Sequence, residues 1–107
     1  MHRLTTAIIS AALAAAAIPA VAAERASDGA FVAAARCQGI LGAAASESLT
    51  AFVQQQRAKR SDHVREQARD AKREGERLAR SGVSPADAAR CARYDQAAAA
   101  AGKVASR

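Results

Sequence analysis

The chain has 107 residues, of which 16 are Lys or Arg and 10 are Asp or Glu, giving a formal net charge of +6. Only 3% of the residues are aromatic, so the chain lacks the stacking side chains that bind single-stranded nucleic acid. A chain of this length suits one small domain, whose core alone provides a narrow margin of stability. We therefore expect a single domain and no nucleic-acid partner.

Residues 1–23 have the pattern of a secretory signal peptide. A charged start at Arg3 comes before a mostly apolar stretch, and Pro19 precedes a run of small residues. A membrane-spanning helix needs about 20 apolar residues, and this stretch is shorter. We therefore expect cleavage after Ala23, with cleavage after Ala22 as the alternative. The product would be exported to the periplasm or to the outside of the cell.

The first helix of the mature chain is predicted over residues 28–44. Ser27 or Asp28 can cap its start. Small and apolar residues then recur in steps of three and four, which indicates one buried helical face. Gly39 and Gly42 lower the helix propensity, but they would allow another backbone to approach closely.

Residues 47–80 are interpreted as one long helix that can bend near 57–62. Val53 and Val64 lie about three helical turns apart, so they share one face if the helix is unbroken. Ser61 could instead cap a fresh start. Opposite charges three or four residues apart cover the other faces, which is typical of a solvated helix surface. A dedicated anion-binding face is the alternative.

The clearest local pattern marks the start of a last helix at Pro85. Gly82 stops the preceding helix, Ser84 supplies an N-cap, and proline suits the first helical position. Asp87 places an acidic side chain in the first turn, where the helix dipole favours it. We expect this helix to continue to about residue 101 and to end at the glycine that follows.

The two cysteines, Cys37 and Cys91, are expected to form one intramolecular disulfide. Export would bring them to an oxidising compartment, where disulfides persist. Thiols that stay unpaired or join two chains are the alternative, and a redox pair is disfavoured because the C-x-x-C spacing is absent. A disulfide that closes a loop this long contributes up to about 4 kcal/mol.

These elements predict an all-α fold over residues 24–107, a small three-helix array after a cleaved signal peptide. The turn before Pro85 would fold the last helix back along the long charged helix as a hairpin. The disulfide would then tie this hairpin to the first helix.

Residue types that carry catalysis or bind metals are scarce in the mature chain. His63 is its only histidine, and no second histidine or cysteine lies at ligand spacing from it. The sequence contains no G-x-S-x-G motif, no P-loop and no dinucleotide-binding motif. We therefore predict a protein that is not an enzyme, with no catalytic residues, no metal and no cofactor.

Two functional classes remain. The leading hypothesis is a non-catalytic protein of the bacterial envelope that acts by contact with an unidentified protein partner, or as a stress or stability accessory. The alternative is a basic helical module that binds an anionic lipid or polysaccharide surface, such as lipopolysaccharide, through Arg57, Lys59 and Arg60. Salt separates the two, because screening weakens exposed charge contacts.

Overall fold

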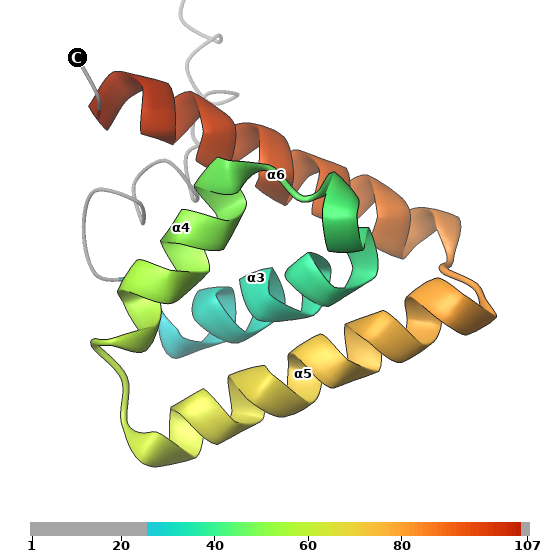
Figure 1. The fold of residues 1–107 in the computed structure, drawn as a ribbon, viewed down its shortest axis with the longest axis horizontal. Coiled ribbons are helices and arrows are strands. Elements are labelled where there is room, and N and C mark those ends of the chain that lie inside the picture. The colour runs from blue at the N-terminus through green and yellow to red at the C-terminus, as the bar shows by residue number, and fades with distance from the viewer. Residues whose placement is uncertain (1–25, 106–107) are drawn as a thin grey trace, which may run out of the picture.

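The structure is a computed structural model that describes residues 26–105, so the predicted signal peptide lies outside the described residues. Within that range every regular element is a helix. In chain order the elements are α3 (Asp28–Leu41), the short 3-10 helix η2 (Gly42–Ala44), α4 (Glu47–Arg57), α5 (Asp62–Ser81) and α6 (Pro85–Ala105) (Figure 1). The prediction of an all-α fold is confirmed, with four α-helices in the described residues instead of three.

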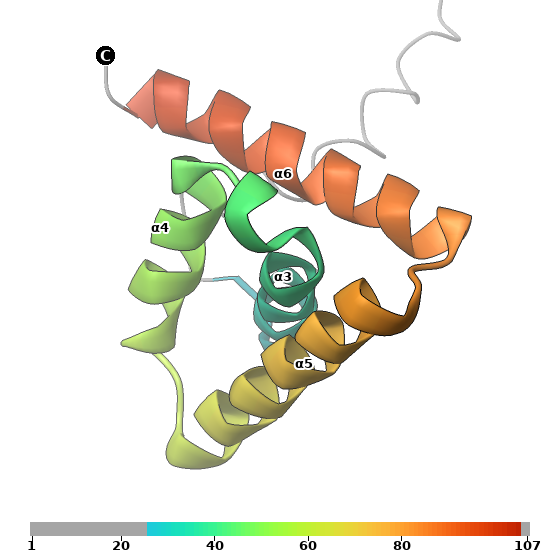
Figure 2. The ribbon, with the colours of Figure 1, turned by 45° about the vertical axis from the view of Figure 1, so that its right-hand side comes forward.

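Helix α3 lies at the centre, and each of the other α-helices packs against it. Helix α5 runs parallel to α3. Arg60, just before α5, contacts Asp28 at the start of α3, whereas Gly75 lies against Gly39 near the end of α3. Helix α4 returns the chain from the end of α3 to the start of α5, and α6 crosses α3 on the side away from α5 (Figures 1 and 2).

The predicted continuous helix over 47–80 is wrong, because residues 58–61 separate α4 from α5. The Ser61 hydroxyl caps the new helix by accepting a hydrogen bond from the Val64 N–H at 3.3 Å. Arg60 turns into the protein at the same break and is 5% exposed. A local cap and a tertiary contact together outweigh the continuity of the apolar pattern.

The predicted hairpin is also wrong, because α5 and α6 diverge after the turn that joins them (Figures 1 and 2). Helix α6 packs on α4 and α3 instead. Helix α5 buries one stripe, formed by Val64, Ala68 and Gly75, and α3 covers that stripe. Helix α5 therefore lacks a second apolar face that could pack against α6.

The predicted ends of the first and last helices differ from the structure at two glycines. Gly42 ends α3 with a φ of 55°. No atom lies within 4 Å of the position that a Cβ atom would take there, so the expected close approach of another backbone at Gly42 is not found. Gly102 lies inside α6, where a Cβ atom would come within 2.7 Å of the Ser48 hydroxyl oxygen. Helix α6 thus continues past the predicted stop, and Gly102 lies close to α4.

The core draws its large apolar side chains from α3, α4 and the start of α5. Phe31, Leu49 and Val53 are at most 2% exposed, and Phe52 and Val64 border them. Burying a side chain of this size contributes about 2 kcal/mol. The core therefore lies on the α3, α4 and α5 side of the molecule, and α6 covers it with Ala98 and the partly buried Tyr94.

Candidate functional site

A close crossing of α3 and α5 determines which side of α5 is free. A Cβ atom on Gly39 would overlap the carbonyl oxygen of Lys72, and a Cβ atom on Gly75 would overlap the carbonyl oxygen of Arg36. Each glycine thus lets the backbone of the other helix approach, which confirms the expectation for Gly39. Because α3 covers this one stripe, the opposite side of α5 is exposed.

Charged side chains cover that exposed side, which we call the outer face of α5. Its members are Glu66, Arg69, Asp70, Arg73, Glu74, Arg77 and Arg80. Ion pairs join Arg73 to Asp70 at 2.7 Å, Arg77 to Glu74 at 3.1 Å and Arg69 to Glu66 at 3.5 Å. The paired side chains remain about half exposed, so each pair contributes only a few tenths of a kcal/mol. Their charges stay accessible to a partner.

The structure places Arg60, one of the three predicted surface contacts, inside the protein. Its side chain is 0% exposed, and its guanidinium lies 5.1 Å from the centre of the Phe31 ring. It donates hydrogen bonds to the Gln56 carbonyl at 3.2 Å and the Gln56 Oε1 at 2.6 Å. A further bond reaches the Asp28 carboxylate at 2.7 Å. These contacts remove Arg60 from the predicted anion-binding surface.

The other two basic residues of that prediction lie outside the core. Arg57 is half-buried in the last turn of α4, and Lys59 is exposed in the break between α4 and α5. The structure therefore does not bring the three cations together on one surface. A contact between Arg57, Lys59 and an anionic surface stays a prediction.

The disulfide between Cys37 and Cys91 joins α3 to α6, as the sequence predicts. The two residues are 54 positions apart in the chain, and their Cα atoms are 5.2 Å apart. Both cysteines are at most 2% exposed. The bond therefore lies inside the protein and ties the last helix to the central one.

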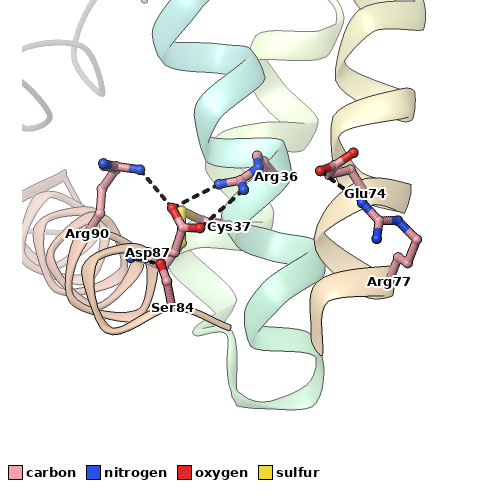
Figure 3. Close-up of polar contacts among 8 residues, drawn as sticks. Arg36, Cys37, Glu74, Arg77, Ser84, Asp87 and Arg90 are labelled. Atoms are coloured by element: carbon pink, nitrogen blue, oxygen red, sulfur yellow. Dashed lines mark hydrogen bonds and ion pairs between the residues drawn. A yellow bond between two sulfur atoms is a disulfide. The ribbon is translucent and has the colours of Figure 1, made fainter. Parts of the chain in front are cut away.

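An ion pair lies beside the disulfide and joins the same two helices (Figure 3). Arg36 precedes Cys37, and its two terminal nitrogens donate to the two carboxylate oxygens of Asp87, each at 3.2 Å. Arg90 donates to the same carboxylate at 2.9 Å. We call Arg36, Cys37, Asp87 and Cys91 the clasp, because they connect α3 and α6 by one covalent bond and one two-pronged ion pair.

The charges of the clasp stabilise each other. Hydrogen bonds from Arg36 lower the pKa of the Asp87 carboxyl, and burial opposes this effect only in part. The hydrogen bond to Asp87 likewise raises the pKa of Arg36. Both groups are therefore charged at neutral pH. Both oxygens of the Asp87 carboxylate accept hydrogen bonds from Arg36. The group is therefore better suited to holding the two helices together than to transferring a proton.

A second polar contact connects α6 to the start of α4. The Ser46 hydroxyl caps α4 by accepting from the Leu49 N–H at 3.1 Å. The Ser46 N–H in turn donates to the Asp95 carboxylate at 2.8 Å. Asp95 on α6 therefore satisfies a backbone donor that α4 leaves open at its N-terminus.

Within residues 26–105 no three His, Cys, Asp or Glu side chains are grouped so that they could hold a metal ion. No helix in the same range is long and apolar enough to cross a membrane. Comparisons with protein-family models, with curated proteins and with solved structures found no match.

Proposed function

We propose that this chain is a non-catalytic, exported protein of the bacterial envelope that binds another protein through the outer face of α5. The observation that carries the proposal is the placement of α5. This helix is 20 residues long, and it packs along α3 on one side (Figure 2), where its buried residues are Val64, Ala68 and Gly75. Its charged side is thus presented to solvent along the helix.

The mixture of charges on the outer face favours a protein partner over a polyanion. Arginines alternate with carboxylates, as in the pairs Arg69 with Glu66 and Arg73 with Asp70. Carboxylates repel phosphate groups, whereas a protein surface can place a complementary charge opposite each of them. Arginine is also enriched among the residues that dominate protein interfaces.

Export is the second part of the proposal. Residues 1–23 have the pattern of a signal peptide, and the disulfide suits an oxidising compartment. The folded body begins close to the predicted cleavage site after Ala23. Ala26 is 2% exposed, and its N–H donates to the Gln56 Oε1 at 3.0 Å. Cleavage after Ala23 would leave this anchor intact.

In-cell photo-crosslinking tests the binding surface. A photo-reactive amino acid in place of Arg73 should give one discrete adduct with another protein. The matched control replaces Ala51, which is exposed on α4. Reversing Arg69 and Arg77 to Glu should abolish the adduct at position 73, because complementary charges would become repulsive. Equal adducts from positions 73 and 51, or none from either, would contradict the proposal.

Anionic vesicles separate this proposal from the basic-module alternative. We expect no binding to vesicles or lipopolysaccharide at physiological salt. Binding that moderate salt weakens, and that the pair of changes Arg57→Gln and Lys59→Gln abolishes, would favour the alternative instead.

A further inference from the structure

Helix α6 contributes little to the apolar core. Its buried side chains among residues 85–102 are Cys91 and Ala98, and Tyr94 is half-buried. The large buried side chains belong to α3, α4 and α5. A body made of those three helices therefore keeps all of the large buried apolar side chains, whereas loss of α6 would uncover the sides of α4 and α3 on which it packs.

Polar and covalent contacts hold α6 in place. The clasp fixes its first half to α3, and the Asp95 carboxylate binds the Ser46 N–H of α4. The connection between α5 and α6 is short, and Gly82, whose φ is 135°, caps the end of α5. Since α5 and α6 diverge from this turn, rotation about it would move α6 without disturbing α5 (Figure 1).

The ion pair of the clasp and the disulfide join the same stretch of α3 to the first half of α6. Cys37 and Cys91 are at most 2% exposed, whereas the side chains of Arg36 and Asp87 are 29% and 19% exposed. The pair thus lies nearer to solvent than the sulfurs, and it holds α6 against α3 beside them (Figure 3). A thiolate must approach along the S–S axis to break the bond, so α6 has to move away from α3 first.

We propose that α6 is a releasable helix: the Arg36–Asp87 ion pair limits access of thiols to the Cys37–Cys91 disulfide, and reduction of this bond by a dithiol frees α6 from a body of α3, α4 and α5 that stays folded. This redox response is independent of the partner proposed for the outer face of α5.

The reductive step balances with the dithiol as the only reductant. One thiolate of the dithiol attacks a cysteine sulfur, the S–S bond breaks, and the other cysteine leaves as a thiolate that takes up a proton. The second thiol of the dithiol displaces the bound cysteine. The protein gains two electrons and two protons, and the dithiol becomes a disulfide.

Released α6 keeps its own helical signals. The Ser84 hydroxyl caps it by accepting from the Asp87 N–H at 3.1 Å, and the helix is 21 residues long and rich in alanine. Alanine has the highest helix propensity, and α6 is longer than the roughly 12–15 residues below which isolated helices are marginal in water. Release should therefore preserve much of the helical circular-dichroism signal while it removes the contacts of α6.

Reduction kinetics with dithiothreitol test the role of the ion pair. The rate for Asp87→Asn should exceed that of the wild type by about tenfold, because the loss of a charge-assisted contact raises the population of the open form. The control Asp70→Asn breaks the exposed pair with Arg73 on α5 and should leave the rate unchanged. Equal rates for Asp87→Asn and the wild type would overturn the proposal.

Hydrogen exchange distinguishes release of α6 from general unfolding. In the reduced wild type, and in the double variant Cys37→Ser and Cys91→Ser, amides of α6 and the Ser46 N–H should lose protection. Amides of α3, α5 and the interior of α4 should keep theirs. Loss of protection in all helices, or unchanged protection of α6, would overturn the proposal.

Discussion

At the level of single residues, the burial of Arg60 stabilises the break between α4 and α5. The sequence places it in a basic cluster, yet its guanidinium binds Gln56 and Asp28 beneath the break between α4 and α5. A periodic pattern does not reveal which of several neighbouring cations turns inward. The nearby Ser61 and the absence of large apolar residues between Val53 and Val64 were the signals that favoured a break.

The burial of Arg60 leads to a stability prediction. Arg60→Gln should lower the free energy of unfolding by about 1.5–3 kcal/mol, because it leaves buried acceptors without their charged donor. The matched control Lys59→Gln, at an exposed position, should change it by less than about 0.5 kcal/mol. Urea unfolding of the two variants measures the difference. The same midpoint for both would contradict the buried role of Arg60.

Ser84 supports the start of α6. Its hydroxyl accepts a hydrogen bond from the Asp87 N–H at 3.1 Å, as the sequence predicts. Ser84→Ala should therefore cost about 0.5–2 kcal/mol of stability. Thermal or urea unfolding of the variant tests this, and an unchanged unfolding midpoint would show that the cap does not stabilise the helix.

Asp87 also predicts a pH dependence. Hydrogen bonds from Arg36 lower the pKa of Asp87 in the folded protein below its usual value of about 3.9. The stability it contributes is thus present above that usual value and is lost as pH falls through the lower folded value. The wild type should exceed Asp87→Asn in melting temperature at neutral pH, and the gap should close in strong acid. A gap that does not vary with pH would show that the ionised carboxylate is not involved.

At the level of elements, the glycine crossing of α3 and α5 is the contact most sensitive to side-chain size. Gly39→Ala should destabilise the protein by about 1–3 kcal/mol, because the added methyl group overlaps the Lys72 carbonyl. Gly29→Ala is the matched control on the same helix, where a Cβ atom meets nothing within 4 Å. The control should be neutral or stabilising by up to about 1 kcal/mol. Equal losses for both variants would contradict the close crossing.

Helix starts were more predictable than helix ends and partners. Ser27 and Ser84 act through their own side chains on backbone groups three residues away, so the sequence alone reveals them. Helix α6 continues past Gly102, where it lies close to Ser48, a residue far away in the chain. Contacts of this kind leave no local pattern.

At the level of the whole molecule, the disulfide was predictable and the topology was not. A chain with two cysteines allows one intramolecular pairing, so the bond between Cys37 and Cys91 could be predicted from the sequence. The parallel packing of α3 and α5 depends on which small-residue stripes meet. The ion pair between Arg36 and Asp87 follows from that topology, so it could not be foreseen from either residue alone.

The proposed export and the disulfide that joins α6 to α3 can be tested on one sample. Mass spectrometry of the protein purified from its native compartment, digested without reduction, tests both parts together. We expect a mature chain that begins at Glu24 and a linked peptide pair that contains Cys37 and Cys91. A chain that retains Met1 and carries two alkylated thiols would contradict it.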